Sequence, residues 1–307
     1  MKILIVGGTG MIGGHAAVHL SAQGHEVVLA SRRPAAGETP MAGFPTLVGD
    51  YTKGDFTTAD LAPFDAIVFA AGNDIRHLPK GLDEREFWRV TQIEGVPAFV
   101  ARARQAGVKR LVHLGSYYHQ VLPHLADTNA YVHARMQADH GARALATADF
   151  NVSTLNPPSI VGVMTGIPAR RYEVLAAWGR GELPDIPDFA PAGGTNYMSV
   201  RSLVEAIEGA LRGAESGKAY LIGDQNLTFR AFFQMIVEAV GGTRSIEERN
   251  EEHPLLPDAF IVPGRGHVLS YEPEPGEVAM LGYRRNDVRR AVDEIVGSLE
   301  PARAGHQ

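Results

Sequence analysis

Residues 1–13 read MKILIVGGTGMIG, and their pattern is typical of a strand, a glycine-rich turn and the start of a helix. The apolar run Ile3–Val6 predicts a short buried strand, and a helical pattern begins at Met11 and stops at Gly24. Glycines in the turn between them let backbone N–H groups at the helix N-terminus approach a pyrophosphate. We therefore expect a dinucleotide-binding turn, with a merely tight turn as the alternative. The residues expected to contact the dinucleotide are Gly7, Thr9, Gly10, Met11, Ile12 and Gly13.

The end of the second expected strand indicates which dinucleotide is bound. Folds that bind NAD usually carry Asp or Glu here for the adenosine ribose, whereas this chain has Ser31, Arg32 and Arg33. A carboxylate would repel a 2′-phosphate, whereas the Ser31 hydroxyl and the two guanidinium groups are expected to bind one, since arginine forms paired, charge-assisted hydrogen bonds with phosphate. The pattern predicts NADP(H), unless the two arginines are only solvated loop residues. After the third strand, Asp50 and the adjacent Tyr51 are expected beside the adenine.

Strands and helices alternate along the first half of the chain. The expected strands are Ile3–Val6, Val27–Ala30, Thr46–Val48, Ala66–Ala71, Arg110–Leu114 and Asn151–Leu155. The helices expected between or after them are Met11–Gln23, Glu84–Ala106 and Ala130–Ala148. This order implies right-handed βαβ units around a parallel sheet that is covered on both faces. We therefore predict an α/β fold with a Rossmann-type doubly wound parallel sheet.

The character of the chain changes after Pro157-Pro158, where glycine, proline and loops become frequent. We expect residues 1–158 to form the dinucleotide-binding domain. Residues 159–300 are expected to form mainly a smaller α/β substrate domain, from which some segments return to the sheet. Helices are expected in this part near Ala169–Trp178, Arg201–Arg212, Thr228–Val240 and Asn286–Leu299. Residues 301–307 are expected to be a flexible tail.

The composition argues against several classes of protein. The 307 residues carry a net charge of −6, which favours neither nucleic acid nor an anionic membrane surface as a partner. The chain has no cysteine, which excludes disulfides and thiolate chemistry, and its 12 histidines show no metal-binding spacing. No apolar stretch is long enough to span a bilayer, and the N-terminal apolar run is too short for a signal peptide. We expect a soluble cytoplasmic protein without a metal site.

Ser116 and Tyr131 are the expected catalytic pair. Ser116 follows the fifth strand, at the carboxyl edge of the sheet where open α/β folds bind ligands, and Tyr131 begins the next helix. Both hydroxyls can donate to one carbonyl oxygen, and a phenol can pass on its proton as hydride reaches the carbon. Because the pKa of an ordinary tyrosine is about 10, the mechanism needs a cation nearby. Arg135, one helical turn further on, supplies one on the same face.

These motifs resemble the extended short-chain dehydrogenase/reductase superfamily. Its members include NAD-dependent epimerase/dehydratase-like enzymes of nucleotide sugars and dihydroflavonol-type NADPH reductases, and the reductases are closest in character to this chain. The resemblance covers about residues 1–300 and rests on the order of Gly7–Gly13, Ala70-Ala71-Gly72, Ser116, Tyr131, LNPPSIVG at 155–162, TNYMSVRSL at 195–203 and LGY at 281–283. It implies a cofactor site that also includes Ala70, Ala71, Gly72, Tyr131, Arg135, Pro157 and Ile160.

The chain departs from the family pattern at four positions. Arg135 replaces the lysine of the family's triad, and Ser31 replaces the acid of NAD-preferring members. Thr91 stands at the usual asparagine of the long helix, and Asn156 occupies an arginine position in the sixth strand. Arginine supplies charge and can bond a nicotinamide ribose, but it does not deprotonate and therefore cannot join a proton relay. We expect cofactor binding to survive this replacement better than turnover does.

Residues that follow the strand ends are candidates for contact with a substrate. We expect such contacts from Asp74, Tyr117 and Tyr118, with ordinary loop or packing roles as the alternative. The same two interpretations apply to the neighbouring Arg76 and His77. Trp178, in the second domain, is expected either over the substrate or in the core. The residues expected to contact a substrate are therefore Asp74, Tyr117, Tyr118 and Trp178.

Two classes of function stay open. The first is an NADPH-dependent oxidoreductase that reduces the carbonyl group of a small organic ketone or aldehyde. The second is a non-catalytic NADP-binding redox sensor or scaffold, which the replacement by Arg135 suggests. A sugar-nucleotide epimerase or dehydratase fits less well, because those relatives usually retain bound NAD. Relatives often dimerise through the helices expected at 84–106 and 131–148, so a homodimer and a monomer both stay open.

Overall fold

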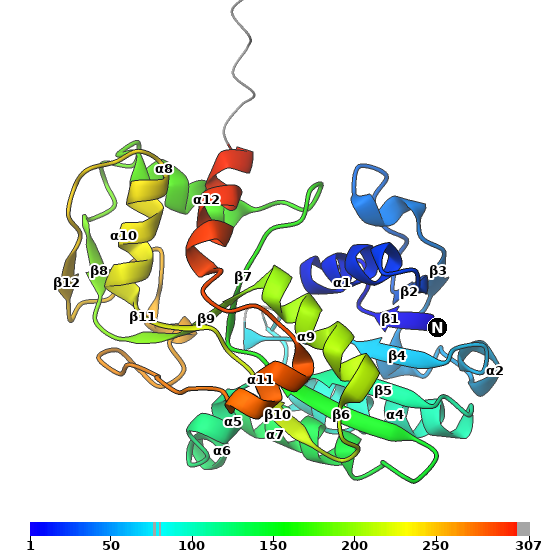
Figure 1. Ribbon diagram of the computed structural model, residues 1–307. Helices are drawn as coiled ribbons and strands as arrows, with labels where there is room; N and C mark the ends of the chain where they lie inside the picture. Colours follow the sequence, from blue (N-terminus) through cyan, green and yellow to red (C-terminus); the bar gives the residue numbers. More distant parts are fainter. Residues whose placement is uncertain (76–77, 80, 300–307) are drawn as a thin grey trace, which may run out of the picture.

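Seven parallel strands form the main sheet, in the order β10-β6-β5-β4-β1-β2-β3 (Figure 1). The computed structural model describes residues 1–75, 78–79 and 81–299. The strands are β1 (Lys2–Val6), β2 (Glu26–Ser31), β3 (Thr46–Val48), β4 (Ala66–Phe69), β5 (Arg110–Leu114), β6 (Asn151–Asn156) and β10 (Ala219–Leu221). The strand order reverses between β1 and β4, which is where open α/β sheets bind ligands. The predicted Rossmann-type fold is confirmed.

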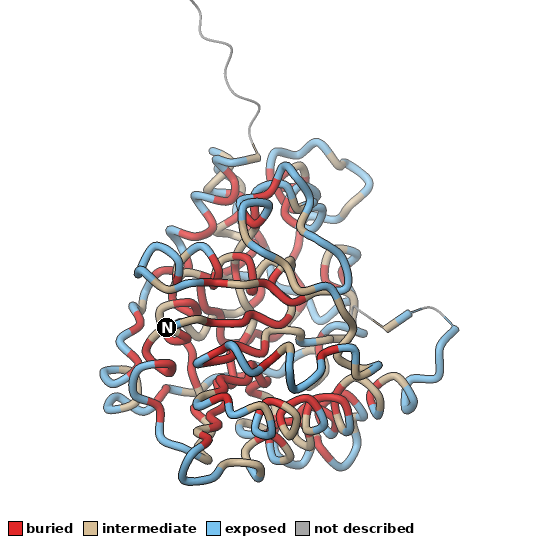
Figure 2. The backbone as a smooth tube through the Cα atoms, turned by 90° about the vertical axis from the view of Figure 1, so that its right-hand side faces the viewer, coloured by how far each residue is buried: buried red, intermediate tan, exposed pale blue. Residues whose placement is uncertain are grey.

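Helices cover both faces of this sheet because alternate strand residues point to opposite sides. In β1, Ile3 and Ile5 face one layer of helices, whereas Leu4 and Val6 face the other. All four are buried, and Figure 2 shows buried backbone concentrated along the central strands. One layer contains α1 (Met11–Ala22), α9 (Val200–Gly213) and α11 (Pro275–Leu281), and the other contains α2 (Thr58–Leu61), α4 (Gly95–Gln105) and α7 (Ala130–Arg143).

A smaller unit, built from segments after residue 158, carries two further sheets. Its strands are β7 (Ser159–Val161), β9 (Gly194–Ser199) and β11 (Gln225–Thr228) in one sheet, and β8 (Phe189–Pro191) and β12 (Glu247–Arg249) in the other. Its helices are α8 (Arg170–Gly179), α10 (Phe229–Ala239) and α12 (Val288–Leu299). Tyr197 of β9 stacks on Phe232 of α10 with ring centroids 4.5 Å apart, so sheet and helix share one core.

The chain returns to the main sheet after entering the smaller unit. β10 pairs with β6 at the sheet edge, and α9 packs on α1. Asp224, three residues after β10, is buried and accepts hydrogen bonds from the backbone N–H groups of Asn286 and Asp287, at 2.5 and 2.9 Å. These bonds hold Asn286 in a left-handed conformation, with φ 62°, immediately before α12. The two units are therefore joined by several crossings of the chain near this carboxylate.

The long helix expected at Glu84–Ala106 is interrupted, so that prediction is wrong in its middle. The segment consists of α3 (Glu84–Trp88), a π-helical turn at Arg89–Ile93, and α4. A Cβ at Gly95 would lie 2.2 Å from the carbonyl oxygen of Val90, so the wide turn closes only because residue 95 has no side chain. Single π-helical turns frequently occur at functional sites, and this one lies beside the site described below.

The remaining helices are short. They are α5 (Tyr118–Val121) and α6 (Leu125–Thr128), and both pack against α7. Within the described ranges, no helix is both long and apolar enough to cross a membrane.

A buried ionic network holds α7 in place. Asp139 accepts hydrogen bonds from His119 at 3.0 Å and Arg143 at 2.7 Å, and Arg143 also donates to the carbonyl oxygen of Gly217 at 3.0 Å. Burial alone would raise the pKa of Asp139, but the hydrogen bonds from His119 and Arg143 outweigh it and hold that pKa well below the usual range. The network therefore ties α7 to α5 and to the turn before β10.

We predict that Asp139→Asn lowers the free energy of unfolding by about 3 kcal/mol at pH 7, the size typical of breaking a buried ion pair. Because the folded-state pKa is depressed, this stabilisation is present above about pH 4 and is lost as the pH falls further. The difference between variant and wild type should therefore shrink toward pH 3. Urea unfolding between pH 3 and pH 7 measures it, with the exposed Asp149→Asn as control. A constant difference across this range would contradict the assignment.

Candidate functional site

The glycine turn brings together the end of β1, the start of α1 and the end of β4. Gly7 has φ +82°, and a Cβ there would lie 2.8 Å from the backbone nitrogen of Ala71. A Cβ at Gly13 would lie 2.3 Å from the carbonyl oxygen of Gly7. Both positions require glycine because the helix, the strand and the neighbouring loop meet at backbone contact distance. Ala71 thus supports the turn from behind.

Gly10 has a different role, since the space around it is open. A Cβ there would meet only the carbonyl oxygen of Gly7, at 3.4 Å. Gly10 is the N-cap of α1, and no side chain caps this helix end. The first N–H groups of α1 therefore remain available for an anion. This open, uncapped helix end fits the pyrophosphate of a dinucleotide.

The loop after β2 offers two arginines at the same edge of the sheet. Arg32 and Arg33 are exposed, and no carboxylate in the described part of the chain pairs with either of them. The Ser31 hydroxyl donates to the carbonyl oxygen of Arg33 at 2.5 Å, so it shapes the turn and does not offer its proton to a ligand. The guanidinium groups fit a 2′-phosphate, and their contact with one stays a prediction.

Asp50 and Tyr51 are both held by protein contacts. Oδ1 of Asp50 accepts from the backbone N–H and the hydroxyl of Thr52, at 3.0 and 2.7 Å, and Oδ2 remains for an adenine amino group. The Tyr51 phenol donates to the carbonyl oxygen of Thr91 at 2.8 Å and accepts from Asn73 at 3.3 Å. Burial raises the pKa of Tyr51, so this phenol stays protonated and fixes the π-helical turn.

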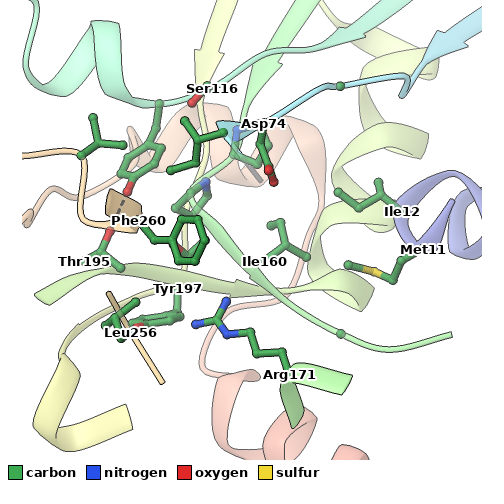
Figure 3. Close-up of a pocket in the computed structure, with 18 of the residues that line it drawn as sticks. Met11, Ile12, Asp74, Ser116, Ile160, Arg171, Thr195, Tyr197, Leu256 and Phe260 are labelled. Carbon is green, nitrogen blue, oxygen red and sulfur yellow. Dashed lines mark hydrogen bonds between the residues drawn. The ribbon is translucent and has the colours of Figure 1, made fainter. Parts of the chain in front are cut away.

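A cavity of about 710 Å³ lies between the main sheet and the smaller unit (Figure 3). It begins at the first turn of α1 and extends under the loops of the smaller unit. The residues predicted to bind cofactor that line it are Met11, Ile12, Ala70, Gly72, Tyr131, Arg135, Pro157 and Ile160. The glycine turn and the cavity are therefore continuous, as a nicotinamide site next to a pyrophosphate site requires.

Ser116 and Tyr131 both lie on the wall of this cavity. Asn129 caps the first turn of α7, and Tyr131 is the second residue of this helix. The Tyr131 ring packs against Trp88 and Tyr118, with centroids 5.3 and 6.2 Å away. Among the described residues, the hydroxyls of Ser116 and Tyr131 have no hydrogen-bond partner. Both are therefore free to donate to a carbonyl oxygen in the cavity.

Arg135 is buried behind Gly72, one turn further along α7. Its Nη2 donates to the carbonyl oxygens of Leu114 and Gly115, at 2.8 and 2.5 Å, and its Nη1 donates to Oε1 of Gln92 at 3.2 Å. Its Nε has no partner in the described structure. The side chain therefore places a fixed positive charge at the end of β5, while most of its N–H groups already bond to the protein.

Gln92 reaches Arg135, whereas Thr91, at the position of the family's asparagine, bonds within its own segment. The Thr91 hydroxyl donates to the carbonyl oxygen of Phe87 at 2.7 Å, within its own helical segment. Gln92 is fully buried, and its Nε2 is unpartnered in the described structure. The sequence pattern indicates a continuous helix and contains no signal for the π-helical turn that rotates Gln92 inward. Sequence reasoning therefore missed this residue.

Three of the residues predicted to contact substrate lie on the cavity wall. They are Asp74, Tyr117 and Tyr118. The Tyr117 phenol forms a hydrogen bond of 2.7 Å with the hydroxyl of Thr195, and burial raises its pKa. Tyr117 therefore joins the two units at the cavity and is a poor proton donor. Arg76 and His77 lie outside the described residues.

Trp178 does not contact the cavity, so its predicted substrate role is wrong. The side chain is 1% exposed and packs in the core of the smaller unit, 5.2 Å from Phe233 between ring centroids. Its indole N–H donates to the carbonyl oxygen of Pro187 at 3.1 Å. The reason is the orientation of α8. Its C-terminal part, with Trp178, packs against α10, whereas its first turn lines the cavity.

His119, Asp139 and His140 form a group of metal-ligating side chains in the described structure, with their ligand atoms within 4.8 Å of one another. Both carboxylate oxygens of Asp139 already accept hydrogen bonds from His119 and Arg143. The ionic network under α7 therefore accounts for this group.

Sequence comparison identifies the family. A family model described as the NAD dependent epimerase/dehydratase family matches residues 3–223. The chain belongs to this family. Its members are NAD(P)-dependent oxidoreductases and epimerases, which agrees with the glycine turn and with the predicted extended short-chain dehydrogenase/reductase resemblance. The family match does not distinguish the dihydroflavonol-type reductases from the other members of the family.

The similarity to individual proteins is lower or covers only part of the chain. A 3-beta-hydroxysteroid dehydrogenase of Mycolicibacterium neoaurum is 32% identical over 122 residues, which cover 38% of this chain and 32% of that protein. The match thus spans about a third of the length of this curated relative. Among solved structures, gox2253 has a TM-score of 0.77 at 17% identity, with 96% of this chain and 97% of that chain covered. MoeE5, solved with UDP-glucuronic acid and NAD, has a TM-score of 0.71 at 19% identity, with 97% and 98% covered. At these identities the structures share the fold.

We predict that Gly10→Val folds like the wild type and loses cofactor binding, because its side chain would occupy the open space above α1. Gly13→Ala should instead destabilise the chain, because its Cβ would collide with the Gly7 carbonyl oxygen. Thermal unfolding followed by circular dichroism, together with NADPH titration by intrinsic fluorescence, separates the two effects. Normal NADPH binding to folded Gly10→Val would show that the turn does not hold the pyrophosphate.

Proposed function

We propose that this protein is an NADPH-dependent reductase of a carbonyl group in a small organic ketone or aldehyde. The observation that carries the proposal is the pair of unbonded hydroxyls, Ser116 and Tyr131, on a cavity continuous with the glycine turn. Two hydroxyl donors on the wall of one cavity suit a carbonyl oxygen that gains negative charge during reduction.

Each residue has a defined task in this mechanism. NADPH held at the glycine turn and by Arg32 and Arg33 would supply a hydride for the carbonyl carbon. Ser116 donates a hydrogen bond to the carbonyl oxygen, and Tyr131 gives its phenolic proton to that oxygen as negative charge develops there. Arg135 holds a fixed positive charge at the end of β5, one helical turn along α7 from Tyr131. The Trp88 and Tyr118 rings hold the Tyr131 ring in position throughout.

The proposed preference for NADP rests on the loop after β2. Arg32 and Arg33 are exposed and lack carboxylate partners among the described residues, which suits a doubly charged 2′-phosphate. MoeE5 was solved with NAD. This chain carries Ser31 where NAD-preferring relatives have an acid, so the ribose hydroxyls of NAD would find no carboxylate acceptor at this position.

A second candidate function is an NADP-binding sensor without turnover. One observation favours it: the guanidinium group of Arg135 is largely occupied by Leu114, Gly115 and Gln92. An arginine held in this way offers few donors to a nicotinamide ribose and cannot relay a proton. Incubation of the purified protein with NADPH and a panel of aldehydes and ketones separates the two functions, because only the reductase consumes NADPH.

We predict that NADPH binds at least about tenfold more tightly than NADH, which corresponds to about 1.4 kcal/mol. Arg32→Ala should lose affinity for NADPH and keep its affinity for NADH, because the lost contact is with the 2′-phosphate. Fluorescence titration of both cofactors measures this, with Arg104→Ala, exposed and distant from the cavity wall, as control. Equal or reversed affinities in the wild type would refute the NADP preference.

We predict that Tyr131→Phe lowers turnover by roughly 10²- to 10⁴-fold, the effect of removing a general acid, and leaves cofactor affinity nearly unchanged. Arg135→Lys should retain or raise turnover, because lysine is the residue of the family's triad. Arg135→Met should lose most turnover and weaken NADPH binding. Since this change also removes the partner of two backbone carbonyls, its thermal unfolding must be measured alongside. Turnover that survives Tyr131→Phe intact would refute Tyr131 as the proton donor.

A further inference from the structure

Two adjacent arginines lie at the far side of the cavity from the glycine turn. Arg170 and Arg171 form the first turn of α8, and both line the cavity. The N-cap of this helix, Ala169, has no side chain that could cap the helix end. The positive end of the helix dipole and two guanidinium groups therefore coincide at one place on the wall.

Arg171 is directed into the cavity and has no ionic partner in the described part of the chain. Figure 3 shows its side chain extending from α8, with the guanidinium group near Tyr197. Burial raises the pKa of Tyr197, and the charge of Arg171 is the main influence that opposes this. The positive charge of Arg171 therefore acts on Tyr197, a residue of the cavity wall.

The wall between this arginine and the hydroxyl pair is mostly apolar. Ile160 and Leu256 contribute aliphatic side chains, and Phe260 contributes an aromatic ring that is 43% exposed. In Figure 3 the Phe260 ring points into the cavity. The Thr195 hydroxyl is already bonded to the Tyr117 phenol, so it offers little to a sugar hydroxyl. An exposed ring on a cavity wall indicates an apolar ligand surface.

The charged residues that line the cavity are unevenly distributed. Positive charge comes from Arg135, Arg170 and Arg171, and negative charge comes from Asp74. Asp74 follows β4, on the side of the cofactor, whereas Arg170 and Arg171 belong to the smaller unit. A ligand that crosses the cavity thus meets hydroxyl donors at one end and an unpaired guanidinium group at the other.

We propose that the substrate is an acidic carbonyl compound with an apolar body, whose carboxylate pairs with Arg171 while its carbonyl group lies at Ser116 and Tyr131. This proposal rests on the proposed reductase function and names its substrate class. Arginine suits the role because its planar fork donates two parallel hydrogen bonds to a carboxylate. Arg170 adds positive charge next to it. The apolar body packs against Ile160, Phe260 and Leu256.

The test compares acids with their methyl esters in the protein saturated with NADP⁺. The probes are 4-acetylbenzoate and 3-(4-acetylphenyl)propanoate, which place the same ketone at two distances from the acid. Calorimetric titration should show that at least one acid binds about tenfold or more tightly than its ester, as a charge-assisted pair implies. In Arg171→Gln this ratio should fall to about one. Arg180→Gln, at the other end of α8 and away from the cavity, should keep the ratio.

Several results would overturn the proposal. These are equal binding of acid and ester, no binding of either, an equal effect of Arg180→Gln, and Arg171-dependent binding of UDP-glucose without binding of the acids. The reductase function is tested separately by NADPH consumption with the same compounds. Acid binding without turnover would refute the reductase and keep the Arg171 site, whereas turnover without preference for acids would do the reverse.

Discussion

The close packing of α1 against β1 is the constraint on which the rest of the site depends. A Cβ at Gly13 would approach the Gly7 carbonyl oxygen to 2.3 Å, so helix and strand are in backbone contact. This contact places the uncapped N-terminus of α1 at the reversal in strand order between β1 and β4. A helix displaced by one side chain would move its N–H groups away from the groove and separate Met11 and Ile12 from the cavity.

The parts of the fold that follow from local pattern were predictable, and those that follow from tertiary contacts were not. The apolar strands and the glycine turn are encoded by adjacent residues, so the parallel sheet could be derived from sequence. The π-helical turn at Arg89–Ile93 depends on the approach of Gly95 to the Val90 carbonyl, which no periodicity reveals. The same limit explains why no sequence pattern pointed to Gln92, which contacts Arg135.

The orientation of α8 in the smaller unit could likewise not be predicted from the sequence. A helix near Ala169–Trp178 was expected, and α8 is present, but its pattern does not say which end meets the cavity. The structure directs Trp178 into the core and Arg171 to the cavity wall. The side chains that define a substrate are therefore set by how two units meet. The residues of the candidate cofactor site instead lie at strand ends and helix starts of the main sheet, which local sequence pattern indicates.

The central claim is that one cavity aligns NADP with the Ser116 and Tyr131 hydroxyls. A crystal structure of the protein with NADP⁺ tests this most directly. We expect the 2′-phosphate on Arg32 and Arg33, the pyrophosphate over Gly10, and the Tyr131 phenol facing the space next to nicotinamide C4. A 2′-phosphate in solvent away from both arginines, or a Tyr131 phenol turned away from the nicotinamide, would contradict it.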